Sequence, residues 1–142
     1  MKLSVQAYTV RDHLNQDFLG WLNRLRGMDL RYVELAGFGG YSAKDLAGHL
    51  KKIGISVSGF HQGIDWSQDI VAQAKEAAEA AKYLETNYVI LPWVGQDQYR
   101  DGWDLFCQRL EPYAETVQAA GKKFLYHNHS FEFGVDRHKR PG

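Results

Sequence analysis

The segment ISVSGFHQGIDWSQDIVAQAKEAAEAAKYLETNYVILPW, residues 55–93, contains a complete strand–helix–strand unit. Residues 55–60 and 88–91 are short apolar runs, which are typical of buried strands. Between them, residues 70–84 are rich in alanine, lysine and glutamate, which favour a helix. Strands that alternate with helices of this length pair in parallel through right-handed crossovers. The segment therefore predicts an α/β fold.

The same alternation continues on both sides of this unit. Further strands are expected at residues 3–8, 32–35 and 123–127. Apolar residues recur at helical spacing over residues 18–25. Residues 42–54 begin with a serine that can cap a helix and end with a glycine that can stop one. The pattern is (βα)4β, with parallel strands.

The last helix is expected between Trp103 and Gly121, where Pro112 indicates a kink or a restart. Cys107 lies among apolar residues of this helix and is expected to be buried. The chain, residues 1–142, has the length of a single domain. Two architectures fit the pattern: an open doubly wound sheet, or part of a (β/α)8 barrel. No glycine-rich phosphate-binding sequence follows the first strand, which disfavours a dinucleotide-binding sheet.

Composition excludes several classes of partner. The 17 lysines and arginines balance the 17 aspartates and glutamates, so no net charge would attract nucleic acid or an anionic membrane. The sequence contains no apolar run of the roughly 18 residues needed to cross a bilayer. The N-terminal residues are too polar for a signal peptide, so a cytoplasmic location is expected.

Polar or aromatic side chains occur at the predicted strand ends, where a barrel gathers its active site. Tyr8, Glu34, His61 and Trp93 lie at the ends of the first four strands, and Asn128 follows the fifth. We expect these five residues to bind the substrate. Each also has a structural alternative: a carboxylate paired with an arginine, a core histidine bonded to a carbonyl, or an aromatic ring that only packs.

The last strand also suggests a metal site. His127 and His129 are two residues apart, so on a strand their side chains point to the same side and can share one divalent ion. Glu132 is the only obvious third ligand nearby. We therefore predict that His127, His129 and Glu132 bind a metal, with an ordinary strand that runs into a loop as the alternative.

Four segments, in this order, resemble the sugar phosphate isomerase/epimerase family, the xylose-isomerase-like TIM barrels. The resemblance runs from Leu3 to about Arg140 and implies a divalent ion (manganese, zinc or magnesium) in the barrel mouth. It also implies proton transfer next to a carbonyl of a small sugar or inositol-type substrate. The segments are VQAYTVRD (5–12), YVELAGFGGYSAKDL (32–46), VILPW (89–93) and YHNHSFEF (126–133).

The resemblance also assigns positions. Glu34 and His61 fall where family members contact substrate hydroxyls, and Trp93 falls at a pocket wall. His127 takes the place of a family ligand that is often a glutamate. The family's other metal ligands come from its last three strands, and a full barrel needs about 250 residues. The chain is therefore expected to form the N-terminal half of a TIM barrel, incomplete as a single chain.

Three functions follow from these patterns. The first is a metal-dependent isomerase or epimerase whose missing half comes from a second copy or another polypeptide. The second is a non-catalytic half-barrel that can bind metal or ligand and self-associates into a homo-oligomer through its exposed sheet edges. The third is a nuclease of the endonuclease IV kind, which the neutral charge disfavours.

Overall fold

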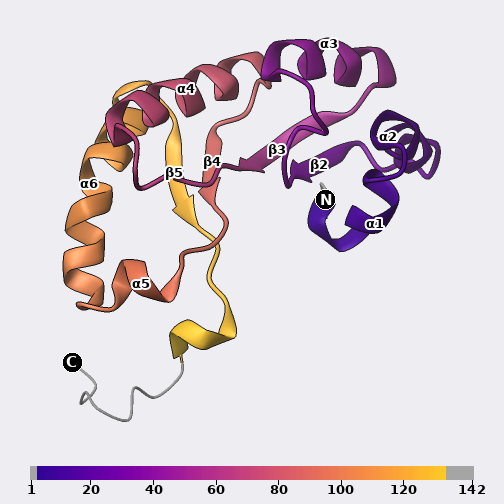
Figure 1. The fold of residues 1–142 in the computed structure, drawn as a ribbon. Coiled ribbons are helices and arrows are strands. Elements are labelled where there is room, and N and C mark those ends of the chain that lie inside the picture. Colours follow the sequence, from indigo (N-terminus) through magenta and orange to yellow (C-terminus); the bar gives the residue numbers. More distant parts are fainter. Residues whose placement is uncertain (1–2, 134–142) are drawn as a thin grey trace.

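The computed structural model describes residues 3–133, which form one parallel sheet with the strand order β1-β2-β3-β4-β5 (Figure 1). Consecutive strands are neighbours, so the chain winds in one direction. A doubly wound sheet reverses its strand order, whereas a barrel does not. The order therefore favours the barrel-type architecture of the two that fit the sequence. The strands are β1 (Ser4–Gln6), β2 (Tyr32–Leu35), β3 (Ser56–His61), β4 (Tyr88–Leu91) and β5 (Lys123–Tyr126).

The larger helices support this conclusion. Helices α3, α4 and α6 form an outer arc around the sheet (Figure 1). Each packs against the next, and α2 packs against α3. The longer helices are α2 (Phe18–Gly27), α3 (Ala43–Ile53), α4 (Ile70–Tyr83) and α6 (Trp103–Ala119). The short ones are η1 (Ala7–Val10), α1 (Arg11–Leu14), α5 (Gln96–Tyr99) and η2 (Ser130–Phe133).

The core lies between the sheet and these helices. Val33 and Leu35 of β2 are buried, and so are Leu46 of α3 and Tyr113 of α6. Helix α4 contributes small side chains, which let it approach its neighbours closely. Its buried residues are Ala74, Ala77, Ala78, Ala80 and Ala81.

Capping residues define the helix boundaries that the sequence indicates. Ser42 Oγ accepts a hydrogen bond from the Asp45 N–H at 3.1 Å, so α3 begins after Ser42 as predicted. Gly54 follows the last turn of α3 with a φ of 80°, a left-handed conformation that favours glycine. Asp69 Oδ1 accepts from the Ala72 N–H at 2.8 Å and starts α4 in the same way.

Three sequence-based expectations about the elements need correction. Strand β1 ends at Gln6, because Gln6 Oε1 accepts a hydrogen bond from the Thr9 N–H and the chain turns into η1. Tyr8 is therefore in a 3-10 helix and not at a strand end. Helix α6 runs through Pro112 without a restart. Pro112 lies on the exposed side of the helix, where water can solvate the carbonyl that loses its partner. Cys107 is exposed and not buried.

The pairing of β2 with β3 contains one irregularity. Val33 pairs with Val57, but Glu34 pairs with Gly59, so Ser58 is an extra residue on β3. Such a bulge bends the strand and changes the direction of the side chains that follow it. The Ser58 hydroxyl forms a hydrogen bond of 2.7 Å with the hydroxyl of Ser4 on β1. The bulge lies three residues before His61, the last residue of β3.

Within residues 3–133, none of the helices has both the length and the apolar character that crossing a membrane requires.

Candidate functional site

The carboxyl ends of the first three strands bring three polar side chains together. These are Gln6 and His61, the last residues of β1 and β3, and Glu34, the last but one of β2. His61 Nε2 donates a hydrogen bond to Glu34 Oε1 at 3.0 Å, and Gln6 Nε2 lies 3.4 Å from the same nitrogen. The His61 side chain is only 10% exposed, whereas that of Glu34 is 29% exposed and can be reached from solvent.

His127 joins this cluster from β5, the strand at the other edge of the sheet. It follows β5 directly, and its N–H donates a hydrogen bond to the Leu91 carbonyl of β4 at 3.0 Å. Its ring meets the His61 ring edge-on, with 5.3 Å between the ring centroids. Glu34, His61 and His127, here called the rim triad, each offer one ligand atom within 4.8 Å of the other two.

The rim triad has a donor set that suits a divalent metal. One carboxylate and two imidazoles match the ligands that zinc and other transition metals take in proteins. Ligand atoms around one tetrahedral zinc are roughly 3.3 Å apart, close to the 3.0 Å between Glu34 Oε1 and His61 Nε2. The three side chains therefore fit a metal ion, which would take the place of the proton between Glu34 and His61.

The electrostatics of His61 favour its neutral form. Burial lowers the pKa of the His61 imidazole, and the hydrogen bond and negative charge of Glu34 offset this lowering in part. His127 and His129 lower the pKa further by charge repulsion. A histidine must be neutral to bind a metal, so this environment keeps His61 ready to act as a ligand near neutral pH.

The carboxylate of Glu132 makes contacts that differ from those of a metal ligand. Its Oε1 accepts a hydrogen bond from the Tyr126 hydroxyl, and its Oε2 accepts one from the His129 N–H at 2.5 Å. Burial raises the pKa of Tyr126, and the bond to Glu132 adds to this effect. Burial also opposes ionisation of Glu132, but the hydrogen bonds from Tyr126 and the backbone outweigh it and lower the pKa of Glu132. Tyr126 thus stays protonated and can donate, and Glu132 stays ionised and can accept.

His129 lies between the rim triad and Glu132. Its ring centroid is 4.9 Å from that of His127. Its Nδ1 is buried without a hydrogen-bond partner in the described part of the chain, and it is 3.8 Å from Glu132 Oε1. Of the three metal ligands predicted from the sequence, the structure brings His127 into the rim triad, and places His129 and Glu132 next to it.

The five predicted substrate-binding residues occupy different surroundings. Glu34 and His61 lie in the rim triad, where they pair with each other, and among residues 3–133 neither pairs with an arginine or a carbonyl. Trp93 follows β4 and is 58% exposed, and its role in substrate binding stays a prediction. Asn128 is exposed beside His127. Tyr8 is exposed in η1 with the Arg11 guanidinium over its ring, and its role in substrate binding stays a prediction.

Two residues of this region were not among the predicted site residues. Gln6 contacts His61, but the apolar pattern extends the first strand to Tyr8 and conceals that Gln6 ends it. The Tyr126 hydroxyl donates to Glu132, and strand periodicity cannot predict which residue accepts this hydrogen bond. A tyrosine six residues before a glutamate is too common a pattern to indicate such a contact.

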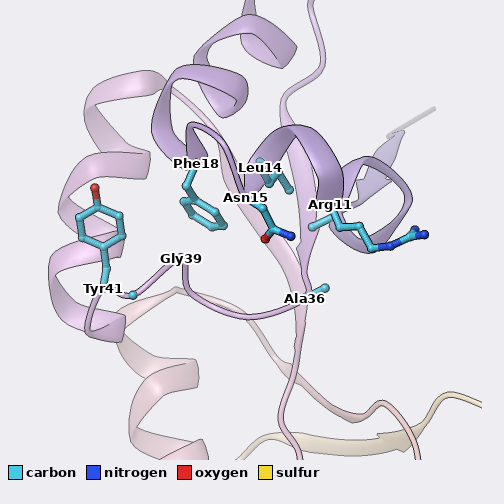
Figure 2. A pocket seen from close by; sticks show the side chains of 9 residues that line it. Arg11, Leu14, Asn15, Phe18, Ala36, Gly39 and Tyr41 are labelled. Carbon is cyan, nitrogen blue, oxygen red and sulfur yellow. The ribbon is translucent and has the colours of Figure 1, made fainter.

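A cavity of about 480 Å³ opens beside the ends of β1 and β2. Figure 2 shows Leu14, Asn15 and Phe18 on one side, with Ala36 and Gly39 opposite. Its volume is that of a small-molecule site. The rim triad does not line it, although Ala36 lies only two residues after Glu34. The cavity and the rim triad are therefore neighbouring but separate features.

Comparison with known proteins relates this fold to solved structures. The sequence matches no protein-family model, and no curated protein matches it significantly. A sugar phosphate isomerase/epimerase from Parabacteroides distasonis matches with a TM-score of 0.79 at 21% identity, covering 99% of this chain and 56% of that chain. A second such protein from that organism has a TM-score of 0.76 at 22% identity, with 93% and 56% covered.

A more distant match has a different printed function. The probable 3-DHS dehydratase AsbF of Bacillus anthracis, involved in petrobactin synthesis, has a TM-score of 0.65 at 15% identity, covering 91% of this chain and 53% of that chain. At these identities the matches show a shared fold. The chain spans about half the length of these structures, which together with the strand order confirms the half-barrel fold.

The environment of His61 leads to a prediction about its titration. In the metal-free protein, we expect an NMR titration to give His61 a pKa below 6.5, because its burial favours the neutral imidazole. In Glu34→Gln the pKa of His61 should fall further, because the hydrogen bond to the carboxylate and its negative charge both raise it. His49, on α3, serves as the internal control. A rise of the His61 pKa in Glu34→Gln would contradict the pairing.

Proposed function

We propose that the rim triad and the loop after β5 form one half of an active site for a metal-dependent isomerase or epimerase. The substrate is a small sugar or inositol-type compound, and the reaction is proton transfer next to its carbonyl group. The observation that carries this proposal is the convergence of Glu34, His61 and His127 from three strands at one rim. Two of the solved structures with this fold are named sugar phosphate isomerase/epimerases, which supports the assignment.

Glu34, His61 and His127 are the residues that hold the metal in this proposal. Two imidazoles with one carboxylate suit zinc or manganese better than magnesium, which prefers oxygen ligands. A divalent ion there polarises a carbonyl group and stabilises negative charge on its oxygen. Gln6 Nε2 lies 3.4 Å from His61 Nε2 and packs beside that imidazole.

Trp93 and Asn128 bind the substrate beside the metal. The exposed indole of Trp93 offers a flat apolar face of the kind on which a sugar ring stacks. The Asn128 amide can both donate and accept, which suits the hydroxyl groups of such a ring. Trp93 follows β4, which lies between the strands of His61 and His127, and Asn128 comes directly after His127.

His129 moves the proton. Isomerisation and epimerisation need a group that removes a proton from the carbon beside the carbonyl and returns it. The His129 side chain is 38% exposed, so part of its ring can meet a substrate, while its buried Nδ1 faces Glu132 Oε1. A neutral imidazole has the basicity for this near neutral pH. Its ring lies 4.9 Å from that of His127, so it is next to the proposed metal.

Cobalt binding tests the ligand assignment. We expect the chain to bind one Co²⁺, observed as visible absorption bands during a titration. Glu34→Ala, His61→Ala and His127→Ala should each lower the affinity more than about tenfold, because each removes a ligand. His129→Ala should retain the affinity, as should the control His49→Ala on α3.

The same titration separates the two possible ligand sets. Loss of cobalt in His129→Ala, with affinity kept in His61→Ala, would overturn the rim triad in favour of His127, His129 and Glu132. Failure of the wild-type chain to bind cobalt would favour the non-catalytic alternative.

Deuterium exchange tests the reaction. The chain with Mn²⁺ is incubated with fructose or xylulose in deuterium oxide, and NMR follows the protons beside the carbonyl. We expect these protons to exchange in the wild type and not in His129→Ala, although His129→Ala keeps its metal. The control His49→Ala should exchange as the wild type does. Absence of exchange in the wild type would favour a half-barrel without activity of its own.

The second candidate function is a self-associating half-barrel without catalysis, and the sheet itself favours it. Strands β1 and β5 each have one neighbour in the described sheet, so each leaves one side of its backbone unpaired. Leu125 of β5 is 42% exposed, and Leu3 beside β1 is also exposed. Unpaired edges with apolar side chains favour pairing with another strand. In this proposal the partner is a second copy of the chain. Its edge strand pairs with β1 or β5 of the first copy, and the rim triads of the two copies face each other.

Sedimentation velocity tests this association. At micromolar concentration we expect the chain to sediment as a dimer or larger oligomer. Leu125→Lys should shift it toward the monomer, because an edge lysine disfavours strand pairing. Leu105→Lys, at an exposed leucine on α6, is the matched control and should not change the oligomeric state. A stable wild-type monomer would rule out this mode of assembly.

A further inference from the structure

We propose that Glu132 is not a metal ligand but a positioning residue, which together with Tyr126 holds the loop of His127, Asn128 and His129 at the rim. This inference rests on the proposed function, because it assigns a task to the residues around the same site. Here Tyr126 and Glu132 are called the latch.

The latch closes the loop at both of its ends. Tyr126 is the last residue of β5, and Glu132 lies in η2. The hydrogen bond from the Tyr126 hydroxyl to Glu132 Oε1 therefore joins the two flanks of the loop. The second oxygen, Oε2, accepts from the backbone N–H of His129 inside the loop. One carboxylate thus fixes the start, the middle and the end of the segment.

Both oxygens of Glu132 are committed to these bonds. The Glu132 side chain is only 9% exposed. Breaking its two hydrogen bonds would leave the Tyr126 hydroxyl and the His129 N–H without an acceptor, which costs free energy. If Glu132 turned to a metal, the Tyr126 hydroxyl and the His129 N–H would both lose a charge-assisted hydrogen bond. The group of ligand atoms within 4.8 Å, as found among residues 3–133, contains Glu34, His61 and His127 and does not contain Glu132.

Aromatic packing anchors the same loop to the neighbouring connection. The Phe131 ring stacks on His129 with a centroid distance of 5.5 Å and planes 12° apart. Phe131 also faces Tyr99 of α5 at 6.1 Å, and Tyr99 stacks on Trp103 at 4.4 Å. The imidazole of His129 is thus held by its ring through Phe131 and by its backbone through Glu132.

The latch acts on the metal site through His127. The loop begins at the end of β5, where the His127 N–H bonds Leu91, and it is held again two residues later at His129. Partners that orient a metal ligand without touching the metal typically contribute 10–100-fold to metal affinity. The latch is therefore expected to set the affinity of the rim triad without supplying a ligand to it.

Tyr126→Phe and Glu132→Gln test the latch, with Tyr83→Phe on α4 as the control at an exposed tyrosine. We expect Tyr126→Phe and Glu132→Gln each to weaken Co²⁺ binding about tenfold while the cobalt absorption spectrum keeps its shape. The double variant should bind no more weakly than the weaker single one, because both changes break one unit. Thermal unfolding of each variant confirms that it folds.

Hydrogen exchange of the His129 amide in the metal-free protein gives a second measurement. We expect this amide to be protected in the wild type and in Tyr83→Phe, and to exchange faster in both latch variants.

The outcomes separate this inference from the proposed function. If the wild type binds cobalt and both latch variants bind it equally well, the latch is overturned and the metal site stands. A changed cobalt spectrum in Glu132→Gln alone would make Glu132 a ligand and also overturn it. If the wild type binds no cobalt but the His129 amide loses protection in both variants, the proposed function fails and the latch still holds the loop.

Discussion

Parallel pairing of consecutive strands is the constraint on which the site depends. Each strand pairs with the next one in the chain, so every carboxyl end falls on the same rim. Glu34 and His61 are 27 residues apart in sequence, and their contact exists only because β2 and β3 are neighbours in this register. His127 reaches them across β4 because β5 continues the same order. A slip of one residue would turn these side chains to the helix-covered face.

The Glu34–His61 pair satisfies both of its polar groups without a metal. Without a metal, the proton on His61 Nε2 satisfies the Glu34 carboxylate, and neither group is left unpaired in a half-buried place. If a divalent ion binds there as proposed, the imidazole would give up that proton and both groups would become ligands. Metal affinity and proton affinity therefore compete at one nitrogen. The burial that favours a neutral His61 moves this competition toward the metal.

Most of the fold could be predicted from the sequence, because strands β2 to β5 and the larger helices carry clear periodicity and capping residues. The turn after Gln6 could not, since residues 3–8 alternate like a strand and only the contact from Thr9 to Gln6 ends it. The convergence of Glu34, His61 and His127 follows from strand order, which the sequence indicates. The direction in which Glu132 points depends on the Tyr126 hydroxyl, a contact that residue types and spacing do not encode.

The bulge between β2 and β3 has a consequence for how this chain can vary. Ser58 is one residue more than regular pairing with β2 requires, and everything after it, including His61, is displaced by that one residue. Removing it would leave regular pairing, with Glu34 still opposite Gly59 and Leu35 still opposite Phe60, so His61 would keep its side of the sheet. The bulge is therefore the one place in β3 where the strand can lose a residue while the imidazole keeps its position at the rim.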